Sequence, residues 1–303
     1  MPSQPMAEVF GYRIDDFSTE AQRHRTHHLC PFNNKVPNCT KDKANDPLGV
    51  CSIYNRNDVT VTCPIRFREN WLIATDAAEF FFPPGTNWTS LTEIRLDDAN
   101  GKSAGNIDVV LVSYDDEGRL TDFGALEVQA VYISGNVRKP FASYMENPPA
   151  HAQLNWQGQK DYPRPDFLSS SRKRLAPQLI YKGGILHSWG RKMAVAVDKA
   201  FFAELPALPQ VDPADAEVVW FIYDLPLGAQ DNRYHMTRVQ AVYTQFTAAL
   251  DRITTATPGP EARFRDLLQS RLDQKHRAAR LGPALISLAE VFEDTSGEAV
   301  EEE

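Results

Sequence analysis

Apolar residues recur along the chain at two spacings, one typical of helices and one typical of strands. Helical spacing occurs in segments 17–28, 71–82, 169–181, 234–255 and 260–280. Ser18 is the predicted N-cap of the first helix, and a further helix is predicted to begin near Thr89, after the breaker Pro83-Pro84-Gly85. Short apolar runs at 59–62, 193–197 and 218–223 predict strands.

The most informative stretch runs from Asn106 to Ser134. Residues 107–114 and 123–133 have the composition of strands, and Asp115-Asp-Glu-Gly118 between them is typical of a turn. They predict an antiparallel hairpin with mostly apolar faces, followed by irregular chain up to about Phe167. Helices before the hairpin and mixed elements after it predict an α/β or α+β fold around a central mixed sheet flanked by helices.

The amino-acid composition indicates a globular protein but does not indicate a function. The chain has 303 residues, of which 42% are apolar and 24% charged, which is typical of a globular protein and excludes collagen-like or wholly disordered classes. No apolar run is long enough for a membrane span, so no membrane partner is expected. The first ten residues lack the features of a secretory signal, which predicts a cytoplasmic protein.

The net charge of −8 argues at first against a nucleic-acid partner. The charge is unevenly distributed, however, with −9 in residues 69–137, +7 in residues 138–199 and −7 in the last 23 residues. The predicted division is an N-terminal lobe over residues 1–70, a main domain over 71–280 and an acidic tail over 281–303.

All four cysteines lie within one 34-residue stretch that is rich in turn-forming residues. In a reducing compartment disulfides are uncommon, and four thiols match the ligand count of a tetrahedral structural metal site. Two disulfides or four unrelated buried thiols remain alternatives at this point. The candidate ligands are Cys30, Cys39, Cys51 and Cys63.

Polar residues interrupt the two strands of the predicted hairpin. Asp108 begins one apolar strand, while Glu127 and Gln129 lie two residues apart on the other and so share a face. Two buried carboxylates need a cation, and Mg²⁺ is a suitable one. Glu93, on the predicted preceding helix, is a candidate third carboxylate. The alternative is that Asp108 caps the strand edge while Glu127 and Gln129 face solvent on a half-exposed sheet.

The spacing Asp-x18-Glu-x-Gln resembles the hairpin of PD-(D/E)xK nucleases, with Gln129 at the position where lysine is usual. Several stretches between residues 8 and 200 resemble the NotI family of type II restriction endonucleases. They are Glu8-Val-Phe-Gly-Tyr12, Cys30-Pro-Phe32, residues 47–53, residues 101–108, residues 124–135 and residues 171–178.

The resemblance implies a restriction-endonuclease-like core of the PD-(D/E)xK type with a four-cysteine metal lobe. It implies a Mg²⁺-dependent homodimer that cuts double-stranded DNA at a GC-rich palindrome, working with a cognate DNA methyltransferase. The four cysteines would then hold iron, with zinc as the alternative, because thiolates suit both metals. Asp108, Glu127 and Gln129 would form the active site, with Glu93 nearby.

The +7 segment offers the predicted DNA contacts, because basic side chains clamp phosphates and arginine reads guanine edges. The chosen candidates are Arg172, Lys173, Arg174 and Lys182, for which a solvated helix face is the alternative. The leading functional hypothesis is a site-specific endonuclease. The alternatives are another PD-(D/E)xK nuclease, acting in phage defence or repair, and a non-catalytic DNA-binding module.

Overall fold

A computed structural model describes residues 2–43 and 45–281. The chain divides into two units, Met1–Thr254 and Thr255–Glu303. The first unit holds both β-sheets that are described below, and the second contains the 21-residue helix α10 (Glu261–Leu281). No helix in the described part of the chain is both long enough and apolar enough to cross a membrane.

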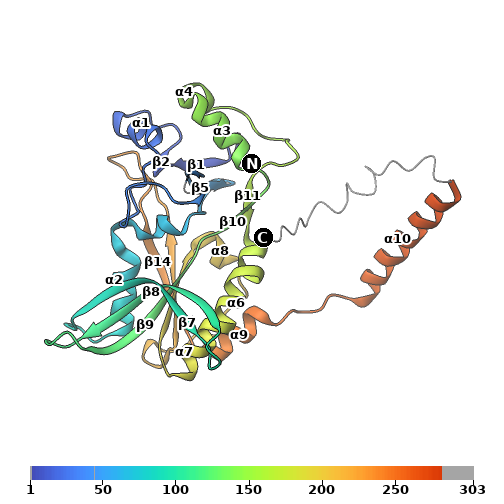
Figure 1. Cartoon of the computed structure of the whole chain (residues 1–303). Helices are drawn as coiled ribbons and strands as arrows, with labels where there is room; N and C mark the ends of the chain where they lie inside the picture. The colour runs from blue at the N-terminus through green and yellow to red at the C-terminus, as the bar shows by residue number, and fades with distance from the viewer. Residues whose placement is uncertain (1, 44, 282–303) are drawn as a thin grey trace. The chain divides into compact units, whose positions relative to one another are not determined.

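A six-stranded mixed sheet forms the centre of the first unit (Figure 1). Its strand order is β14-β13-β12-β9-β8-β7, in which β9, β12 and β13 run parallel and the other neighbours pair antiparallel. In chain order the strands are β7 (Trp88–Asp97), β8 (Ser103–Tyr114), β9 (Leu120–Gln129), β12 (Met193–Asp198), β13 (Val218–Asp224) and β14 (Thr237–Thr244). The predicted mixed α/β fold with a central mixed sheet is confirmed.

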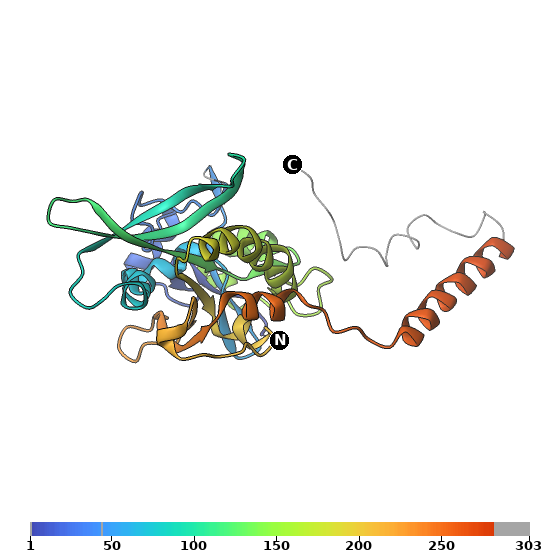
Figure 2. The same cartoon turned by 90° about the horizontal axis from the view of Figure 1, so that it is seen from below.

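Both faces of this sheet are covered, as the almost wholly apolar strand β12 requires. Helix α2 (Leu72–Phe81) packs on one face with Ala194 and Ala196. The helical segment Phe167–Ser188, helix α8 (Lys199–Ala203) and helix α9 (Phe246–Thr254) pack on the other face (Figure 2). Successive residues of β12 therefore alternate between two separate cores, as strand geometry requires.

A second, smaller sheet lies in the N-terminal part of the chain. Its order is β2-β1-β5-β6, and its strands are β1 (Met6–Val9), β2 (Tyr12–Arg13), β5 (Val50–Asn55) and β6 (Asp58–Val61). A third core forms between this sheet and helix α3 (Arg138–Glu146), which the figure shows beside it (Figure 1). Val131 N donates to Val61 O at 2.9 Å, which joins the end of β6 to the chain just after β9.

The remaining elements are short. They are helix α1 (Thr19–Thr26), strands β3 (Asp42–Lys43) and β4 (Asp46–Pro47), the 3-10 helices η1 (Pro64–Trp71) and η4 (Pro213–Asp215), strand β10 (Tyr132–Ser134), helix α4 (Pro148–His151) and strand β11 (Arg164–Asp166). The prediction of α1 is confirmed together with its cap, because the Ser18 side chain accepts a hydrogen bond from Ala21 N.

Two predicted helices are wrong in whole or in part. The segment that begins near Thr89 is the edge strand β7, in which exposed and half-buried residues alternate over Trp88–Thr92. The predicted helix 234–255 divides into β14 and α9. Residues 138–146, predicted to be irregular, form α3. Both missed strands lie at edges of the sheet, where polar residues weaken the apolar spacing that the prediction depended on.

Candidate active site

The hairpin of β8 and β9 brings the two predicted catalytic carboxylates together. Asp108 lies on β8, and its Oδ2 accepts a hydrogen bond from Val128 N at 2.8 Å. Glu127 lies on β9, one residue before Val128. The expected antiparallel hairpin is confirmed by the register that pairs Val109 with Leu126.

Glu127 is fully buried, with 0% of its surface exposed. Burial and the neighbouring Asp108 carboxylate raise the pKa of Glu127 to about 8, against the opposing effect of the Lys182 ammonium. Lys182 Nζ lies 2.7 Å from Glu127 Oε2, whereas Glu127 Oε1 is buried without a hydrogen-bond partner. An unpartnered buried carboxylate oxygen beside a second carboxylate is a suitable place for a divalent cation.

Gln129 is buried two residues after Glu127, at 3% exposure. Its Nε2 donates to Ala130 O at 2.7 Å, so its amide oxygen is the end that remains to accept a hydrogen bond. The alternative in which these polar residues face solvent is excluded for Glu127 and Gln129, because both are buried.

Glu93 lies on strand β7 and not on a helix as predicted. The register pairs Thr92 with Val109 and Ile94 with Ile107, which places Glu93 opposite Asp108. Its backbone has a positive φ of 58°, and one of its carboxylate oxygens lies 3.8 Å from Arg68 Nη2. Its side chain is half exposed, unlike that of Glu127.

The three consecutive basic residues Arg172, Lys173 and Arg174 are all exposed. They lie on one helical segment, Phe167–Ser188, which consists of α5 (Phe167–Ser169), η2 (Ser170–Leu175), α6 (Ala176–Gln178), η3 (Leu179–Gly183) and α7 (Gly184–Ser188). Arg174 stacks over the Tyr132 ring at 5.1 Å. Ser170 Oγ accepts from Tyr132 N at 2.8 Å, which fixes the start of this segment close to the end of β9.

Lys182 occupies a different place from the other basic candidates. It is 4% exposed, and its Nζ contacts Glu127 and the carbonyl of Asn106. The structure therefore places Lys182 beside the buried Glu127 carboxylate and not on the outer basic surface. The sequence contains a signal for this placement, because Lys182 stands in a buried helical stripe with Leu175, Leu179 and Leu186.

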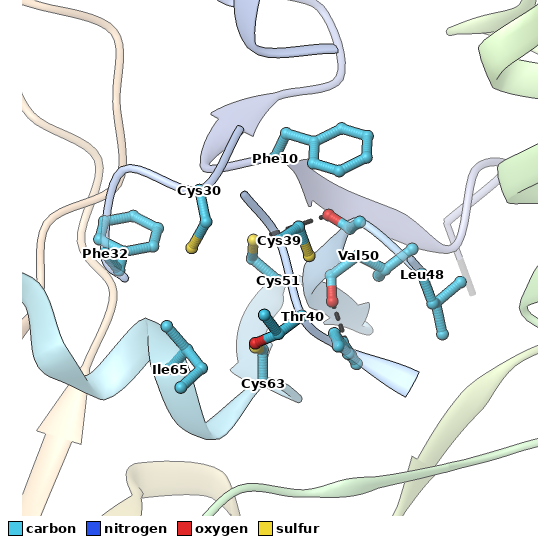
Figure 3. A pocket seen from close by; sticks show the side chains of 12 residues that line it. Phe10, Cys30, Phe32, Cys39, Thr40, Leu48, Val50, Cys51, Cys63 and Ile65 are labelled. Carbon is cyan, nitrogen blue, oxygen red and sulfur yellow. Dashed lines mark hydrogen bonds between the residues drawn. The ribbon is translucent and has the colours of Figure 1, made fainter. Parts of the chain in front are cut away.

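The four cysteines line one small pocket in the N-terminal part of the chain (Figure 3). All four are free thiols, so the disulfide alternative does not hold in this structure. Burial raises the pKa of Cys30 to about 12 and also raises the pKa values of Cys39 and Cys51. The cavity volume is about 10 Å³, which is room for a single ion or water.

The predicted four-cysteine metal site is not shown by the geometry. Among the described residues, no group of three or more His, Cys, Asp or Glu side chains is arranged to hold a metal ion. The four sulfur atoms surround one pocket but do not form a coordinating set as they stand.

Comparison with known proteins identifies the family. A search of curated proteins finds no match to this chain. A family profile described as restriction endonuclease NotI matches residues 8–236, which include strands β2 to β13 and every candidate residue named above. A match over most of the chain, together with two carboxylates on one hairpin, shows that the protein belongs to the NotI restriction endonuclease family, whose members are type II enzymes that hydrolyse double-stranded DNA.

Proposed function

We propose that this protein is a Mg²⁺-dependent, site-specific endonuclease of a restriction-modification system that cuts a GC-rich palindrome. The observation that carries the proposal is the pair of carboxylates Asp108 and Glu127 on adjacent strands, with an unpartnered oxygen on Glu127. Lys182 supplies one positive charge at Oε2, and the unpartnered Oε1 beside the Asp108 carboxylate is a suitable place for a divalent cation. The family membership supports DNA as the substrate.

Asp108 and Glu127 would hold the cation, with Glu93 as a third carboxylate from the strand opposite. Mg²⁺ held by these residues would supply Lewis-acid chemistry, because it would lower the pKa of a water molecule and stabilise negative charge on the phosphate. Gln129 is neutral and is not a general base. Because its Nε2 is bonded to Ala130 O, its amide oxygen is suited to orient the attacking water.

The helical segment Phe167–Ser188 would carry the DNA contacts. Arg172, Lys173 and Arg174 are exposed, and no ion pair with a carboxylate is found for them within the described residues. Unpaired basic side chains are free to bind phosphates, and arginine is the commonest specific reader of guanine. A palindromic site calls for two-fold symmetry and therefore for a homodimer.

The N-terminal lobe would bind a structural iron or zinc through its four thiols. Support comes from the convergence of Cys30, Cys39, Cys51 and Cys63 on one cavity of about the size of an ion. Bound metal would convert the buried thiols to thiolates. The pocket that they line includes neither Asp108 nor Glu127, so this metal would be separate from the one held by the carboxylate pair. The division of the chain into a lobe over 1–70, a nuclease domain over 71–280 and a tail over 281–303 also remains a proposal, as does a cytoplasmic location.

Metal analysis tests the thiol site. Purified protein is expected to contain about one iron or zinc per chain, and Cys51→Ser is expected to lose it together with thermal stability. Glu127→Gln serves as the control that keeps the metal. Neither metal in the wild-type protein would contradict the site.

A digest tests the function. Phage DNA incubated with the protein and Mg²⁺ is expected to give discrete bands, whose ends give the recognition site. A smear would indicate a nuclease without sequence specificity, and no cutting with DNA binding retained would indicate a non-catalytic binding module.

Glu127→Ala tests the role of the carboxylate pair. We expect the substitution to abolish cleavage while sequence-specific DNA binding survives, because it removes a metal ligand and leaves the basic surface unchanged. Loss of binding with the fold intact, as measured by melting temperature and gel shift, would argue against this role.

A further inference from the structure

Lys182 is a buried cation that contacts one of the two carboxylates of the site. Its Nζ donates to Glu127 Oε2 at 2.7 Å and to Asn106 O at 2.8 Å, and the lysine is 4% exposed. An ammonium has three donors, of which two are used here. These contacts join a helix residue to a strand residue 55 positions away in sequence.

The backbone of the helix that carries Lys182 and the backbone at the start of β8 both position its side chain beside Glu127. Pro177 lacks the N–H of a regular helical turn, and the helix around it has wide turns in which Gly184 N donates to Leu179 O. Gly105 has a φ of +108°, which favours glycine, and a Cβ there would lie 3.8 Å from Lys182 Cδ. Asn106, directly after it, supplies the carbonyl that accepts from Nζ. The stretch 101–108 thus positions both Asp108 and the lysine.

Lys182 and a divalent cation would use different oxygens of Glu127. Lys182 binds Oε2, whereas Oε1 has no partner and is buried. Metal binding at Oε1 therefore does not require the lysine to leave. The lysine is also held by Asn106, a contact that a mere counter-ion for Glu127 would not need.

We propose that Lys182 is a positioning residue of the active site, which holds Glu127 through Oε2 so that Oε1 is presented beside Asp108 for the metal. This inference rests on the proposed function and assigns a task to a residue outside the Asp-x18-Glu-x-Gln hairpin. Groups that orient metal ligands commonly affect metal affinity or activity by about 10- to 100-fold.

The test compares Lys182→Met with Lys182→Arg and with Lys192→Met. Lys182→Met keeps the length of the stem but removes the charge and the donors. Lys182→Arg keeps the positive charge and the hydrogen-bond donors. Lys192 is a matched control, because it is half-buried and donates to a backbone carbonyl, Phe80 O at 3.2 Å, away from the carboxylates.

Two measurements are made on the full chain. The first is the binding of Mn²⁺ alone, which is monitored through the electron paramagnetic resonance signal of the free ion. The second is single-turnover cleavage, at saturating Mg²⁺, of a DNA fragment that the wild-type protein cuts. We expect Lys182→Met to weaken Mn²⁺ binding and to slow cleavage, each by about 10- to 100-fold, with Lys182→Arg restoring part of both. Lys192→Met is expected to match the wild-type protein in both.

The opposite results overturn the proposal. Tighter Mn²⁺ binding by Lys182→Met would show that the lysine is only a counter-ion displaced by the metal. Slower cleavage with unchanged Mn²⁺ affinity would show that it does not act through Glu127. If Lys182→Met fails to fold, Lys182→Gln takes its place with the same expectations. A wild-type protein that binds Mn²⁺ but cuts no DNA would contradict the proposed function, while the Mn²⁺ comparison would still decide the role of Lys182.

Discussion

Each polar residue of the site has a distinct environment, although Asp108, Glu127 and Gln129 lie within one hairpin. Glu127 is fully buried and bonded to Lys182, Asp108 is half-buried and bonded to a backbone N–H, and Gln129 is bonded to the carbonyl of its neighbour. Among the residues that the structure describes, only Glu127 has a carboxylate oxygen that is both buried and unpartnered. This difference makes Glu127 the residue whose loss should matter most for metal binding.

The half-exposed Glu93 should have a weaker role than the two carboxylates of the hairpin. We expect Glu93→Gln to raise the Mg²⁺ concentration for half-maximal cleavage while changing the maximal rate little, because the side chain faces Arg68 as well as the Asp108 position. Asp97→Asn, an exposed substitution on the same strand, is the control. An unchanged Mg²⁺ dependence of Glu93→Gln would remove Glu93 from the site.

The elements around the hairpin are held in place by buried polar contacts. Asp198 at the end of β12 is the N-cap of α8, and its carboxylate accepts from Ala200 N at 2.9 Å and from Phe201 N at 3.2 Å. The same carboxylate accepts from Val61 N at 3.0 Å, which ties β6 of the smaller sheet to the central sheet. One side chain thus caps a helix and joins the two sheets.

Asp198→Ala should therefore be strongly destabilising. We expect a loss of about 2–4 kcal/mol in the free energy of unfolding, because the helix loses its cap and a buried N–H of Val61 loses its acceptor. The matched control is Asp212→Ala at the exposed N-cap of η4, which should cost below about 1 kcal/mol. Equal losses in urea unfolding would show that the link between the sheets contributes nothing.

Elements with a strong local pattern were predicted well, and edge elements were not. Helices α1 and α2 and the β8–β9 hairpin lie where apolar spacing and turn residues place them. Strand β7 pairs with only one neighbour and exposes Leu91, Glu93 and Arg95, so its pattern does not distinguish a strand from a helix surface. For β7, pairing with β8 decides the structure, and that pairing is a tertiary property.

At the scale of the molecule, the acidic and basic segments of the chain contribute different parts of the candidate site. The acidic segment 69–137 includes the hairpin carboxylates, and the basic segment 138–199 includes both the exposed run at 172–174 and the buried Lys182. The family match ends at residue 236, before the unit Thr255–Glu303 begins. Within that unit, α10 exposes Phe264, Leu267, Leu268 and Leu272.

We expect a chain that ends at Thr254 to fold without the second unit, because the three cores of the first unit are made of residues before 254. Its melting temperature should lie within about 3 °C of the full chain, which corresponds to about 1 kcal/mol for a domain of this size. Differential scanning calorimetry of the two chains measures this. A larger drop, or loss of a cooperative transition, would show that residues 255–303 contribute to the stability of the first unit.

The sequence by itself determined the hairpin and its polar residues, because strand alternation and turn chemistry act over a few neighbouring positions. It placed Asp108, Glu127 and Gln129 on the correct strands and put four cysteines, which line one pocket, within 34 residues of the chain. Only the tertiary structure decided that Glu93 lies on a strand opposite Asp108 and that Lys182 is buried against Glu127. These contacts depend on how distant elements pack, because the local apolar spacing that predicts a buried Lys182 does not encode which strand residue it contacts.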